Sequence, residues 1–433
     1  MTILDLIEKK KNNKKISEKE FDFFINGLLN NEIKDYQITA FLMTIYFNKL
    51  DFDETFYLTK AIINSGKIFS WPSSVENLID KHSTGGIGDK VSLIILPLLS
   101  CLDVNVAKIS GRGLGYTGGT IDKLDSINMK TDLTNLEATE ILLKNHFFIM
   151  QQTKDIVPAD KILYELRDTS GTINNISLIV ASIMSKKIAL NTNHIYLDVK
   201  VGDGAFFSNL NDAIEFGELC IAVGKKFNKN VLVHYTDMNK PLGRCLGNLI
   251  EVKEAVDFLQ GKFECLYLKE LIFEFSKDIL LDLNICKTPD EAITKIENAI
   301  NSKKAITAFL NWNKFQQGNL KTIQNLNNFY NPKFKKEIKS WKDGYVNFTS
   351  NKQLGLILID LKAGRKVKND KLDFLSGLYL NKYSGEFVKK NETIITVYAS
   401  SEIDEQILNK IKENIEISDK KIDLNKTILK VSK

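Results

Sequence analysis

The stretch DKHSTGGIGD at residues 80–89 and the stretch SGRGLGYTGGTID at residues 110–122 decide the fold of this chain. Both combine glycines with hydroxyl side chains directly after a short apolar run, which is the pattern of a loop that follows a buried strand. Glycines allow the backbone to point its N–H groups at an anion and let that anion come close. Because about 25 residues separate the loops, enough for a connecting helix, we expect them to meet at adjacent strand ends around one polyanion.

Other apolar runs fit the same sheet. The segments 104–109, 195–199 and 231–233 are short, contain β-branched residues, and each ends in a polar or glycine-rich turn. Ligands of α/β sheets bind at the edge where the parallel strands end. These runs therefore predict a large α/β lobe with a mixed, mainly parallel sheet.

Helices dominate the first 65 residues. Ser17 followed by Glu20 is a capping-box pattern that opens an apolar face with helical spacing, and Asp35 and Asp53 are expected to cap the next two helices. Residues 161–187 return to a helical pattern. We therefore expect one small helical lobe that is built from two separate parts of the chain.

The last hundred residues differ again in composition. Residues 343–346 and 384–398 predict β-hairpins, and a helix is expected over residues 405–413. The predicted fold class is thus α/β, with a small all-helical lobe, a large α/β lobe and a C-terminal α+β subdomain. The expected segments are 1–70 and 159–190 for the helical lobe, 75–158 and 191–329 for the α/β lobe, and 330–433 for the C-terminal subdomain.

Composition and charge exclude several classes of protein. The chain has 433 residues, of which 43% are hydrophobic and 26% charged, a globular balance that argues against disorder. Its net charge of +5 is spread along the sequence, so we do not expect nucleic-acid binding. The longest apolar run, Val91–Cys101, has about half the length of a membrane helix, so no membrane partner is expected. Five cysteines without CxxC spacing, and no signal-peptide pattern, favour a reducing cytoplasm.

The first glycine loop contains Lys81 and His82. Lys81 adds a charge that can meet a phosphate, and Ser83, Ser110 and Thr120 supply hydroxyl donors. An isolated histidine is more often structural than catalytic, but a group that titrates near neutrality beside a bound anion can donate or accept a proton. His82 is therefore a candidate catalytic residue, whereas the other three histidines show no partner spacing.

A second cluster lies in the segment that returns to helix. Ser182 and Lys186 are four residues apart and share a helix face, and Arg167 precedes them at the end of another helix. A guanidinium, an ammonium and a hydroxyl suit a flat ring with carbonyl oxygens on which negative charge develops. Taken alone, such residues are more often solvated at a surface. The glycine loops favour the functional interpretation.

The second loop also contains GxGxxG, at Gly113, Gly115 and Gly118, which is the dinucleotide-binding pattern. That pattern is a weak signal alone, and here it does not belong to the first strand–helix turn, because another glycine loop with a Lys-His-Ser triplet precedes it. Neither loop contains the GK[ST] of a P-loop. We therefore do not expect NAD, and no metal site is indicated.

In combination, these motifs resemble the thymidine and pyrimidine-nucleoside phosphorylase family. KISGRGLGYTGGTIDKLD at residues 108–125 is similar to the family signature, and further blocks follow the family order: DKHSTGG at 80–86, LRD at 166–168, DVKVG at 198–202 and TDMNKPLG at 236–243. The C-terminal segments GYV, AGR and SGEFV match as well, so the likeness covers nearly the whole chain.

The resemblance implies a pentosyltransferase of nucleoside salvage. Such an enzyme cleaves a pyrimidine nucleoside with inorganic phosphate, reversibly, and gives the free base and an α-pentose 1-phosphate. The resemblance also implies a homodimer that associates through the helical lobe, and a cleft between the helical and α/β lobes that closes to join the two substrates. Phosphate is a co-substrate, and no cofactor is implied apart from the potassium ion of some relatives.

Residue by residue, the resemblance assigns phosphate, or the sugar beside it, to hydroxyl and ammonium groups of the α/β lobe: Lys81, Ser83, Ser92, Lys108, Ser110 and Thr120. It assigns the base to Arg167, Ser182 and Lys186, with His82 near the O2 atom of the base. Arg167 and Lys186 would stabilise negative charge on the departing base while His82 supplies a proton. His82, Arg167 and Lys186 are therefore the catalytic candidates.

Four positions bear on specificity and on the closed state. Lys108 is typical of relatives that accept uridine as well as thymidine, because an ammonium can hydrogen-bond a 2′-hydroxyl, so we expect uridine, thymidine and deoxyuridine all to be substrates. Tyr116 replaces the usual histidine of the second loop. Asp203 puts a carboxylate near the cleft where a small residue is usual. Lys90 stands where relatives often have a hydroxyl beside potassium, so we expect activity without that ion.

Two alternatives stay open at this point. A reaction like that of anthranilate phosphoribosyltransferase uses a similar architecture, and would need magnesium on an acidic pair, for which Asp89 and Asp122 are the candidates. The other alternative is a catalytically inactive homologue, suggested by Tyr116 and Asp203. Against it, all the candidate catalytic residues are present.

Overall fold

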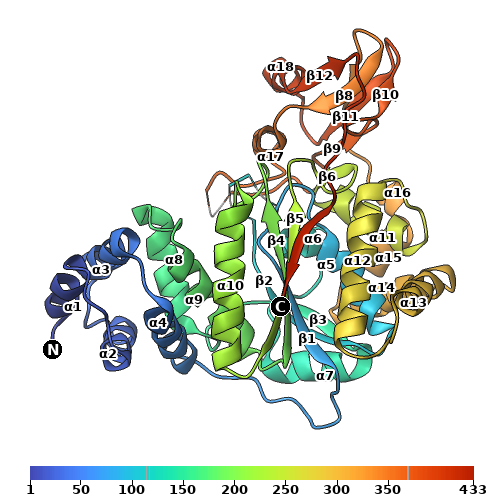
Figure 1. The fold of residues 1–433 in the computed structure, drawn as a ribbon. Helices are drawn as coiled ribbons and strands as arrows, with labels where there is room; N and C mark the ends of the chain where they lie inside the picture. Colours follow the sequence, from blue (N-terminus) through green and yellow to red (C-terminus); the bar gives the residue numbers. More distant parts are fainter. Residues whose placement is uncertain (114, 117, 368–369) are drawn as a thin grey trace.

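The computed structural model describes residues 1–113, 115–116, 118–367 and 370–433. Figure 1 shows three parts: helices at the left, a central sheet flanked by helices, and a C-terminal part of short strands and helices above it. This is the expected α/β class with a helical lobe and a C-terminal α+β subdomain. No helix of the described residues is long and apolar enough to cross a membrane.

The helical lobe comes from two separate stretches of the chain, as the sequence predicts. Apolar residues of both stretches share one core. Its helices are α1 (Ile3–Lys11), α2 (Glu18–Leu29), α3 (Asp35–Asn48), α4 (Phe52–Asn64), α8 (Pro158–Ser170) and α9 (Ile176–Ala189). Residues 161–187 contain two helices, as expected from the place of Arg167 near the end of the first. Gly171 ends α8 with a φ of 71°, in the left-handed region that glycine adopts most easily.

The helix starts differ in part from the expected ones. Ser17 and Glu20 do form the capping box of α2. However, Asp35 is the first residue of α3 rather than its cap, since the chain becomes helical one residue earlier than expected. Asp51, not Asp53, caps α4: its extended backbone leaves its carboxylate free to accept the N–H of Glu54, whereas Asp53 already lies inside the first turn.

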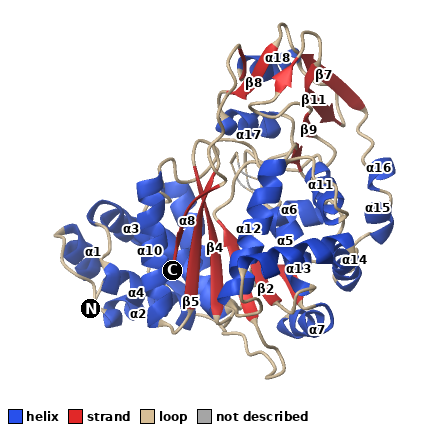
Figure 2. Ribbon diagram, turned by 45° about the vertical axis from the view of Figure 1, so that its right-hand side comes forward, coloured by secondary structure: helices blue, strands red, loops and turns tan. Residues whose placement is uncertain are grey.

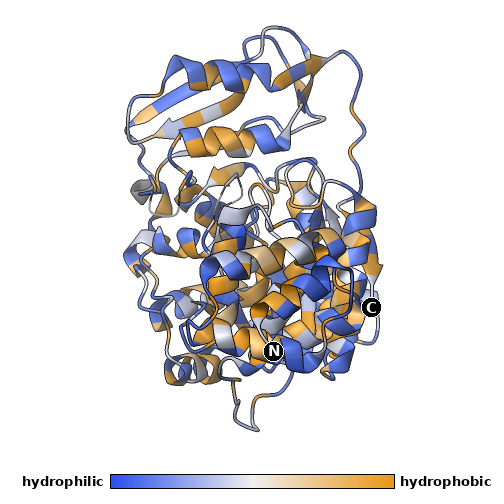
Figure 3. Ribbon diagram, turned by 90° about the vertical axis from the view of Figure 1, so that its left-hand side faces the viewer, coloured by the Kyte–Doolittle hydropathy of each residue, from blue (hydrophilic) through white to orange (hydrophobic). Residues whose placement is uncertain are grey.

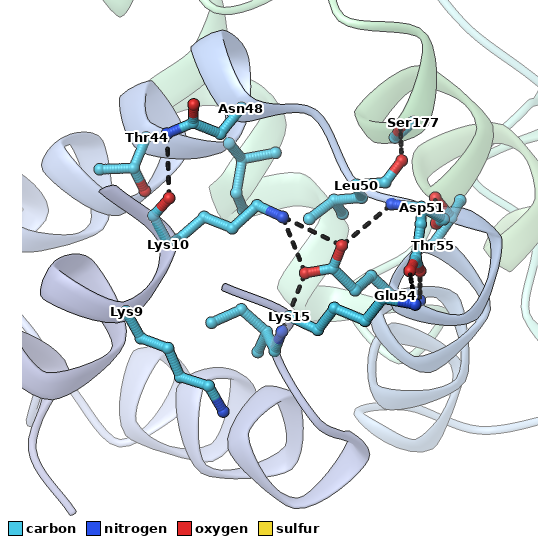
Figure 4. A network of polar contacts seen from close by, with 12 residues as sticks. Lys9, Lys10, Lys15, Thr44, Asn48, Leu50, Asp51, Glu54, Thr55 and Ser177 are labelled. Carbon is cyan, nitrogen blue, oxygen red and sulfur yellow. Dashed lines mark hydrogen bonds and ion pairs between the residues drawn. The ribbon is translucent and has the colours of Figure 1, made fainter. Parts of the chain in front are cut away.

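A buried ion pair braces the helical lobe, as Figure 4 shows. Lys10 of α1 donates to the two carboxylate oxygens of Glu54 of α4 at 2.8 and 3.0 Å. The same carboxylate accepts the backbone N–H of Ile16 at 2.9 Å and that of Asp51 at 3.0 Å. Both charged side chains are buried, and these four hydrogen bonds replace the water that the carboxylate has lost.

The sheet of the α/β lobe has the strand order β13-β5-β4-β1-β2-β3. Its strands are β1 (Leu78–Ser83), β2 (Asn105–Ser110), β3 (Phe147–Gln151), β4 (His194–Val201), β5 (Asn230–Asp237) and β13 (Ile428–Ser432). All neighbours are parallel except β13, which pairs antiparallel with β5. The three apolar runs of the sequence are β2, β4 and β5, so the mixed, mainly parallel sheet is confirmed.

Helices cover both faces of this sheet, as Figure 2 shows. The segment between the two glycine loops is α5 (Val91–Ser100), every residue of which is buried. The other helices of this lobe are α6 (Thr120–Asp125), α7 (Asn135–Asn145), α10 (Leu210–Lys226), α11 (Leu249–Leu259), α12 (Leu266–Asp282), α13 (Pro289–Asn301), α14 (Lys304–Phe315), α15 (Leu320–Gln324) and α16 (Leu326–Phe329).

The C-terminal part contains two small antiparallel sheets, ordered β10-β8-β12 and β6-β9-β11-β7. Its elements are β7 (Phe334–Lys339), β8 (Gly344–Phe348), α17 (Asn351–Asp360), β9 (Gly377–Leu380), β10 (Phe387–Val388), β11 (Thr393–Ala399), α18 (Glu405–Glu413) and β12 (Ile415–Ser418). Helix α17 lies beneath these strands, and much of it is coloured as hydrophobic in Figure 3.

The predicted C-terminal segment 330–433 does not hold together as one separate unit. One of its sheets takes the strand β6 (Cys245–Gly247) from the α/β lobe. Conversely, β13 comes after the C-terminal part in the sequence but pairs with β5 of the central sheet. The two parts of the molecule therefore exchange strands, which local sequence patterns did not indicate because β6 and β13 are short.

Candidate active site

The two glycine loops lie side by side, as expected. They follow β1 and β2, which are parallel neighbours in the sheet. Residues 87–88 of the first loop and residues 115, 116 and 118 of the second line one cavity of about 20 Å³, room for roughly one water molecule. Leu114 and Thr117 of the second loop lie outside the described residues.

A cluster of buried charges underlies the first loop. Lys81 is fully buried, with its Nζ 3.3 Å from Oδ2 of Asp198, the residue opposite Ser83 on β4. Lys200, two residues farther along β4, places its own Nζ 2.8 Å from the same oxygen. Thr236 of β5 donates its hydroxyl to the other oxygen of Asp198 at 2.7 Å. Sequence reasoning quoted Asp198 and Lys200 within a motif but gave them no role.

The carboxylate of Asp89 also interacts electrostatically with these lysines. Ser83 donates its hydroxyl to Oδ2 of Asp89 at 2.5 Å. Burial opposes the charged form of Asp89, but the ammonium groups of Lys200 and Lys81 outweigh it and hold the pKa of this carboxyl well below its usual range. In the structure, therefore, the hydroxyl of Ser83 is hydrogen-bonded to the carboxylate of Asp89, which also interacts with Lys81, a lysine predicted to bind phosphate.

The remaining residues predicted for phosphate lie on β2, α5 and α6. Lys108 of β2 is buried and donates to the carbonyl of Lys81 at 2.5 Å. Burial, together with the charges of Lys187 and Lys81, holds the pKa of Lys108 well below the usual lysine value. Ser92 is buried in the first turn of α5, while Ser110 ends β2 and Thr120 begins α6.

The cluster predicted to hold the base forms on the helical lobe. Lys186 donates to the hydroxyl of Ser182 at 3.0 Å, so these two residues of α9 do share a face. Its ammonium also pairs with Asp160 of α8. Burial lowers the pKa of Lys186 although Asp160 opposes that shift. Sequence reasoning missed Asp160, which lies in the first turn of α8, a preferred place for an acidic residue.

Arg167 is buried between α8 and α9. Its guanidinium donates to the carbonyls of Thr172 at 3.3 Å, Ile173 at 2.8 Å and Leu178 at 3.1 Å. Burial lowers its pKa to about 10, so the group stays charged at pH 7. A guanidinium has five N–H donors, so two remain after these three bonds. Arg167 thus holds the turn between the two helices and still has donors for a ligand.

His82 lies on β1, directly after Lys81. Burial, and then the charges of Lys187, Lys108, Lys81 and Lys186, hold its pKa well below 6.5, so the imidazole is neutral at pH 7. Two of these lysines belong to α9 of the helical lobe and two to the central sheet, so charges from both lobes act on His82.

A buried ion pair also joins the helical lobe to β1, the strand that carries His82. Lys187 of α9 lies 2.8 Å from Oδ2 of Asp80 on β1, and both side chains are buried. Asp80 directly precedes Lys81, and Lys187 directly follows Lys186. This ion pair links the strand of the predicted phosphate site to the helix of the predicted base site.

Two unusual residues connect the loops to the C-terminal part. Tyr116 donates its hydroxyl to the carbonyl of Ala205 at 3.1 Å, and the Nζ of Lys352 lies 5.5 Å from its ring centre. Asp203 was expected to place a carboxylate near the cleft. In the structure, its Oδ2 accepts the hydroxyl of Ser350 at 2.7 Å and the N–H of Lys352 at 2.8 Å, and so satisfies the start of α17.

Oxygen acceptors surround the ammonium of Lys90. Its Nζ donates to the carbonyls of Leu242 and Cys245 and to Oε2 of Glu254, each at 2.7 Å. A β-carbon at position 243 would lie 2.6 Å from this nitrogen, so glycine is required there. Burial opposes the charge of Lys90, but Glu254 outweighs it and raises the pKa of Lys90 above its usual value.

Comparisons with known proteins find related families for successive parts of the chain. Residues 4–66 match the model for the helical bundle domain of a glycosyl transferase family, residues 75–306 match its a/b domain, and residues 345–418 match the pyrimidine nucleoside phosphorylase C-terminal domain. A thymidine phosphorylase of Mycoplasmoides pirum is 47% identical, over 96% of this chain and 100% of its own length.

Two further relatives extend the comparison. A pyrimidine-nucleoside phosphorylase of Staphylococcus haemolyticus is 37% identical, over 96% of this chain and 96% of its own length. The crystal structure of an anthranilate phosphoribosyltransferase from Thermus thermophilus has a TM-score of 0.59 at 13% identity, and the match covers 72% of this chain and all of that one. At that identity, the likeness concerns the fold alone.

Proposed function

The chain belongs to the thymidine and pyrimidine-nucleoside phosphorylase family, and we infer that it is a pentosyltransferase that catalyses the phosphorolysis of pyrimidine nucleosides. One observation in particular supports this function. His82 feels charges both from the buried lysines below the glycine loops and from Lys186 on the helical lobe. An oxyanion and a base with carbonyl oxygens would each find cations there.

We propose that the helical lobe stabilises the departing base. As the bond between sugar and base loosens, negative charge grows on the base and its carbonyl oxygens. The free donors of Arg167 and the ammonium of Lys186 suit this charge, and Asp160 and Ser182 hold the ammonium in place. Arg167 is buried and the side chain of Lys186 is only 19% exposed, so their interaction with that charge is stronger than it would be in water.

The neutral state of His82 sharpens its proposed role. A neutral imidazole has one N–H donor and one acceptor nitrogen, so it hydrogen-bonds the base at first and gains a proton only where negative charge approaches. A phosphate dianion beside Lys81 and Ser83 would supply that charge and raise the pKa of His82. We propose that phosphate binding in this way prepares His82 to protonate the departing base.

We propose that both ribonucleosides and deoxyribonucleosides are substrates. Lys108 donates one N–H to the carbonyl of Lys81, so further N–H groups remain for a 2′-hydroxyl. The test is an assay of uridine, thymidine and deoxyuridine with inorganic phosphate, followed by the absorbance change on release of the base. Cleavage of all three supports the proposal. Cleavage of thymidine with uridine left intact would contradict it.

We propose that the enzyme needs no potassium. The ammonium of Lys90 already joins two carbonyls and a carboxylate, which are oxygen ligands of the kind a monovalent cation would take. Replacing potassium by tetramethylammonium at constant ionic strength should leave the rate of uridine phosphorolysis within about twofold. A loss of more than tenfold would overturn this part of the proposal.

The acidic pair required for a magnesium-dependent transferase finds little support. Asp122 accepts Arg365 at 2.7 Å, the N–H of Gly113 at 2.7 Å and Arg112 at 3.3 Å, so its oxygens are already engaged. Asp89 is engaged by Ser83. Phosphorolysis in the presence of excess EDTA separates the two reactions, since diphosphate chemistry would stop without magnesium.

We also propose a homodimer that forms through the helical lobe, in the cytoplasm. Large apolar side chains are exposed on α1 and α3, which pack against one another: Leu4 at 62%, Tyr36 at 74% and Phe47 at 73% exposure. Contact with a second copy would bury them. Light scattering should give about twice the chain mass, and Phe47→Glu should yield monomers. A monomeric wild type would contradict the proposal. The free cysteines suit a reducing compartment.

A further inference from the structure

Lys123 is a buried lysine beneath the second glycine loop. It lies on α6, one helical turn after Thr120, and its side chain is fully buried. Its nearest anionic partner is Glu251 of α11, with Oε2 at 3.3 Å from Nζ, but the geometry makes no hydrogen bond. Among the described residues, Nζ of Lys123 and Oε2 of Glu251 both lack a hydrogen-bond partner. An ammonium has three donors, so this one is poorly satisfied.

The position of this ammonium relates it to the loops. A β-carbon at Gly118 would lie 3.0 Å from Nζ, so the second loop passes directly over it. Glu251 lines the small cavity that residues of both loops surround. The charge of Lys123 also helps to lower the pKa of Asp89, which accepts the hydroxyl of Ser83 in the first loop. Lys123 therefore interacts with both loops: its ammonium lies against Gly118 of the second loop, and its charge acts on Asp89 of the first.

A buried, incompletely paired cation is costly unless another anion compensates it. The proposed co-substrate is such an anion and would bind on the other side of the thin second loop. We infer that Lys123 is a positioning residue for phosphate. Its charge favours a dianion bound on the far side of Gly118. Because the same charge attracts the carboxylate of Asp89, it also holds the two loops around that dianion. This inference rests on the proposed function, because phosphate is the anion that function supplies.

The experiment compares Lys123→Met with a matched control. Lys10→Met also removes a buried lysine, but one on the helical lobe. In Lys123→Met we expect the KM for phosphate to rise tenfold or more while the KM for the nucleoside stays within about twofold. In Lys10→Met both KM values should stay within twofold of wild type. Lys123→Arg, which keeps the charge, should recover most of the phosphate affinity.

A second measurement covers the case in which Lys123→Met does not fold. Glu251→Gln removes the anionic partner that Lys123 has among the described residues and leaves the ammonium in place. Phosphate should therefore raise the melting temperature of Glu251→Gln at least as much as that of wild type, since binding to the native state stabilises it. A smaller shift would overturn the inference, as would a folded Lys123→Met with an unchanged KM for phosphate.

Direct binding separates this inference from the proposed function. Inorganic phosphate is titrated into each variant by calorimetry without nucleoside. If wild type binds phosphate but cleaves no pyrimidine nucleoside, the proposed function fails, while a weaker affinity in Lys123→Met still supports the inference. If wild type is active and Lys123→Met binds phosphate equally well, only the inference fails.

Discussion

Two buried lysine–glutamate pairs in this molecule differ in how well they are satisfied. Lys10 and Glu54 lie in the helical lobe, where the carboxylate accepts two bonds from the ammonium and two from backbone N–H groups. Lys123 and Glu251 lie below the glycine loops, where the facing atoms are 3.3 Å apart without a hydrogen bond. The Lys10–Glu54 pair, here called the scaffold pair, has its hydrogen bonds satisfied within the protein. The Lys123–Glu251 pair does not, so a further anion can still compensate the charge of Lys123.

The difference teaches how a buried charge can be interpreted. A buried ion pair is stable only when hydrogen bonds replace the water that both groups have lost. Where these bonds are complete, the charge serves the fold. Where they are incomplete and the cation lies next to an anion-binding loop, the missing bonds indicate a ligand. Lys90 has three acceptors at 2.7 Å, so its hydrogen bonds are complete and we interpret its charge as serving the fold.

The scaffold pair gives the largest expected effect. Replacing Lys10 by Met leaves the carboxylate of Glu54 buried and unpaired, so we expect the free energy of unfolding to fall by about 3–5 kcal/mol. Urea unfolding, followed by circular dichroism, measures this loss. The kcat of the folded fraction should stay near that of wild type. A stability loss below 1 kcal/mol would break the comparison.

Lys186 should show the opposite behaviour. Replacing it by Met removes the charge proposed to stabilise the departing base, and kcat/KM for the nucleoside should fall by about 10²–10³, as for the loss of one preorganised donor. Steady-state assays at saturating phosphate measure this. Lys10→Met is the control in the same lobe: it breaks the pair with Glu54 and should act mainly on stability. Equal losses of kcat/KM in both would contradict the assignment.

The pKa of His82 predicts a dependence of stability on pH. Since that pKa lies well below 6.5, the unfolded chain binds a proton that the native state excludes as the pH falls below 6.5. Stability should therefore decrease on acidification from pH 6.5 to 5.5, by at most about 1.4 kcal/mol for this one group. Urea unfolding in phosphate-free buffer, with His82→Asn for comparison, isolates the effect. An equal slope in both proteins would contradict it.

Tyr116 should give the smallest effect. Among the described residues, its hydroxyl makes one hydrogen bond, to the carbonyl of Ala205, which Tyr116→Phe removes. We expect a loss of about 0.5–1.5 kcal/mol, seen as a two- to tenfold fall in kcat/KM for phosphate. An unchanged kcat/KM would mean that the bond plays no part in holding the second loop.

Local patterns predicted much of this molecule. The glycine loops, the strands β2, β4 and β5 and the shared face of Ser182 and Lys186 all follow from spacing over a few residues, and the structure contains them. The C-terminal helix was expected with its observed bounds. What binds at the loops stays a prediction, because spacing shows which groups are close and not what they hold.

The rest depends on partners that are distant in the chain. Asp160 meets Lys186, and Glu251 meets Lys123, only after the lobes have folded. Each of these carboxylates has an ordinary place on a helix, so sequence alone gave no reason to select it. The contact of Asp203 with the start of α17 was not predicted for the same reason: this helix begins almost 150 residues later.

Strand β13 has a consequence for the border of the central sheet. Its five residues pair antiparallel with β5, the outermost of the parallel strands on that side. A local opening that frees β13 would therefore uncover the backbone N–H and C=O groups of β5. Those groups could then pair with a strand of a neighbouring chain, so β13 protects this border of the sheet against aggregation.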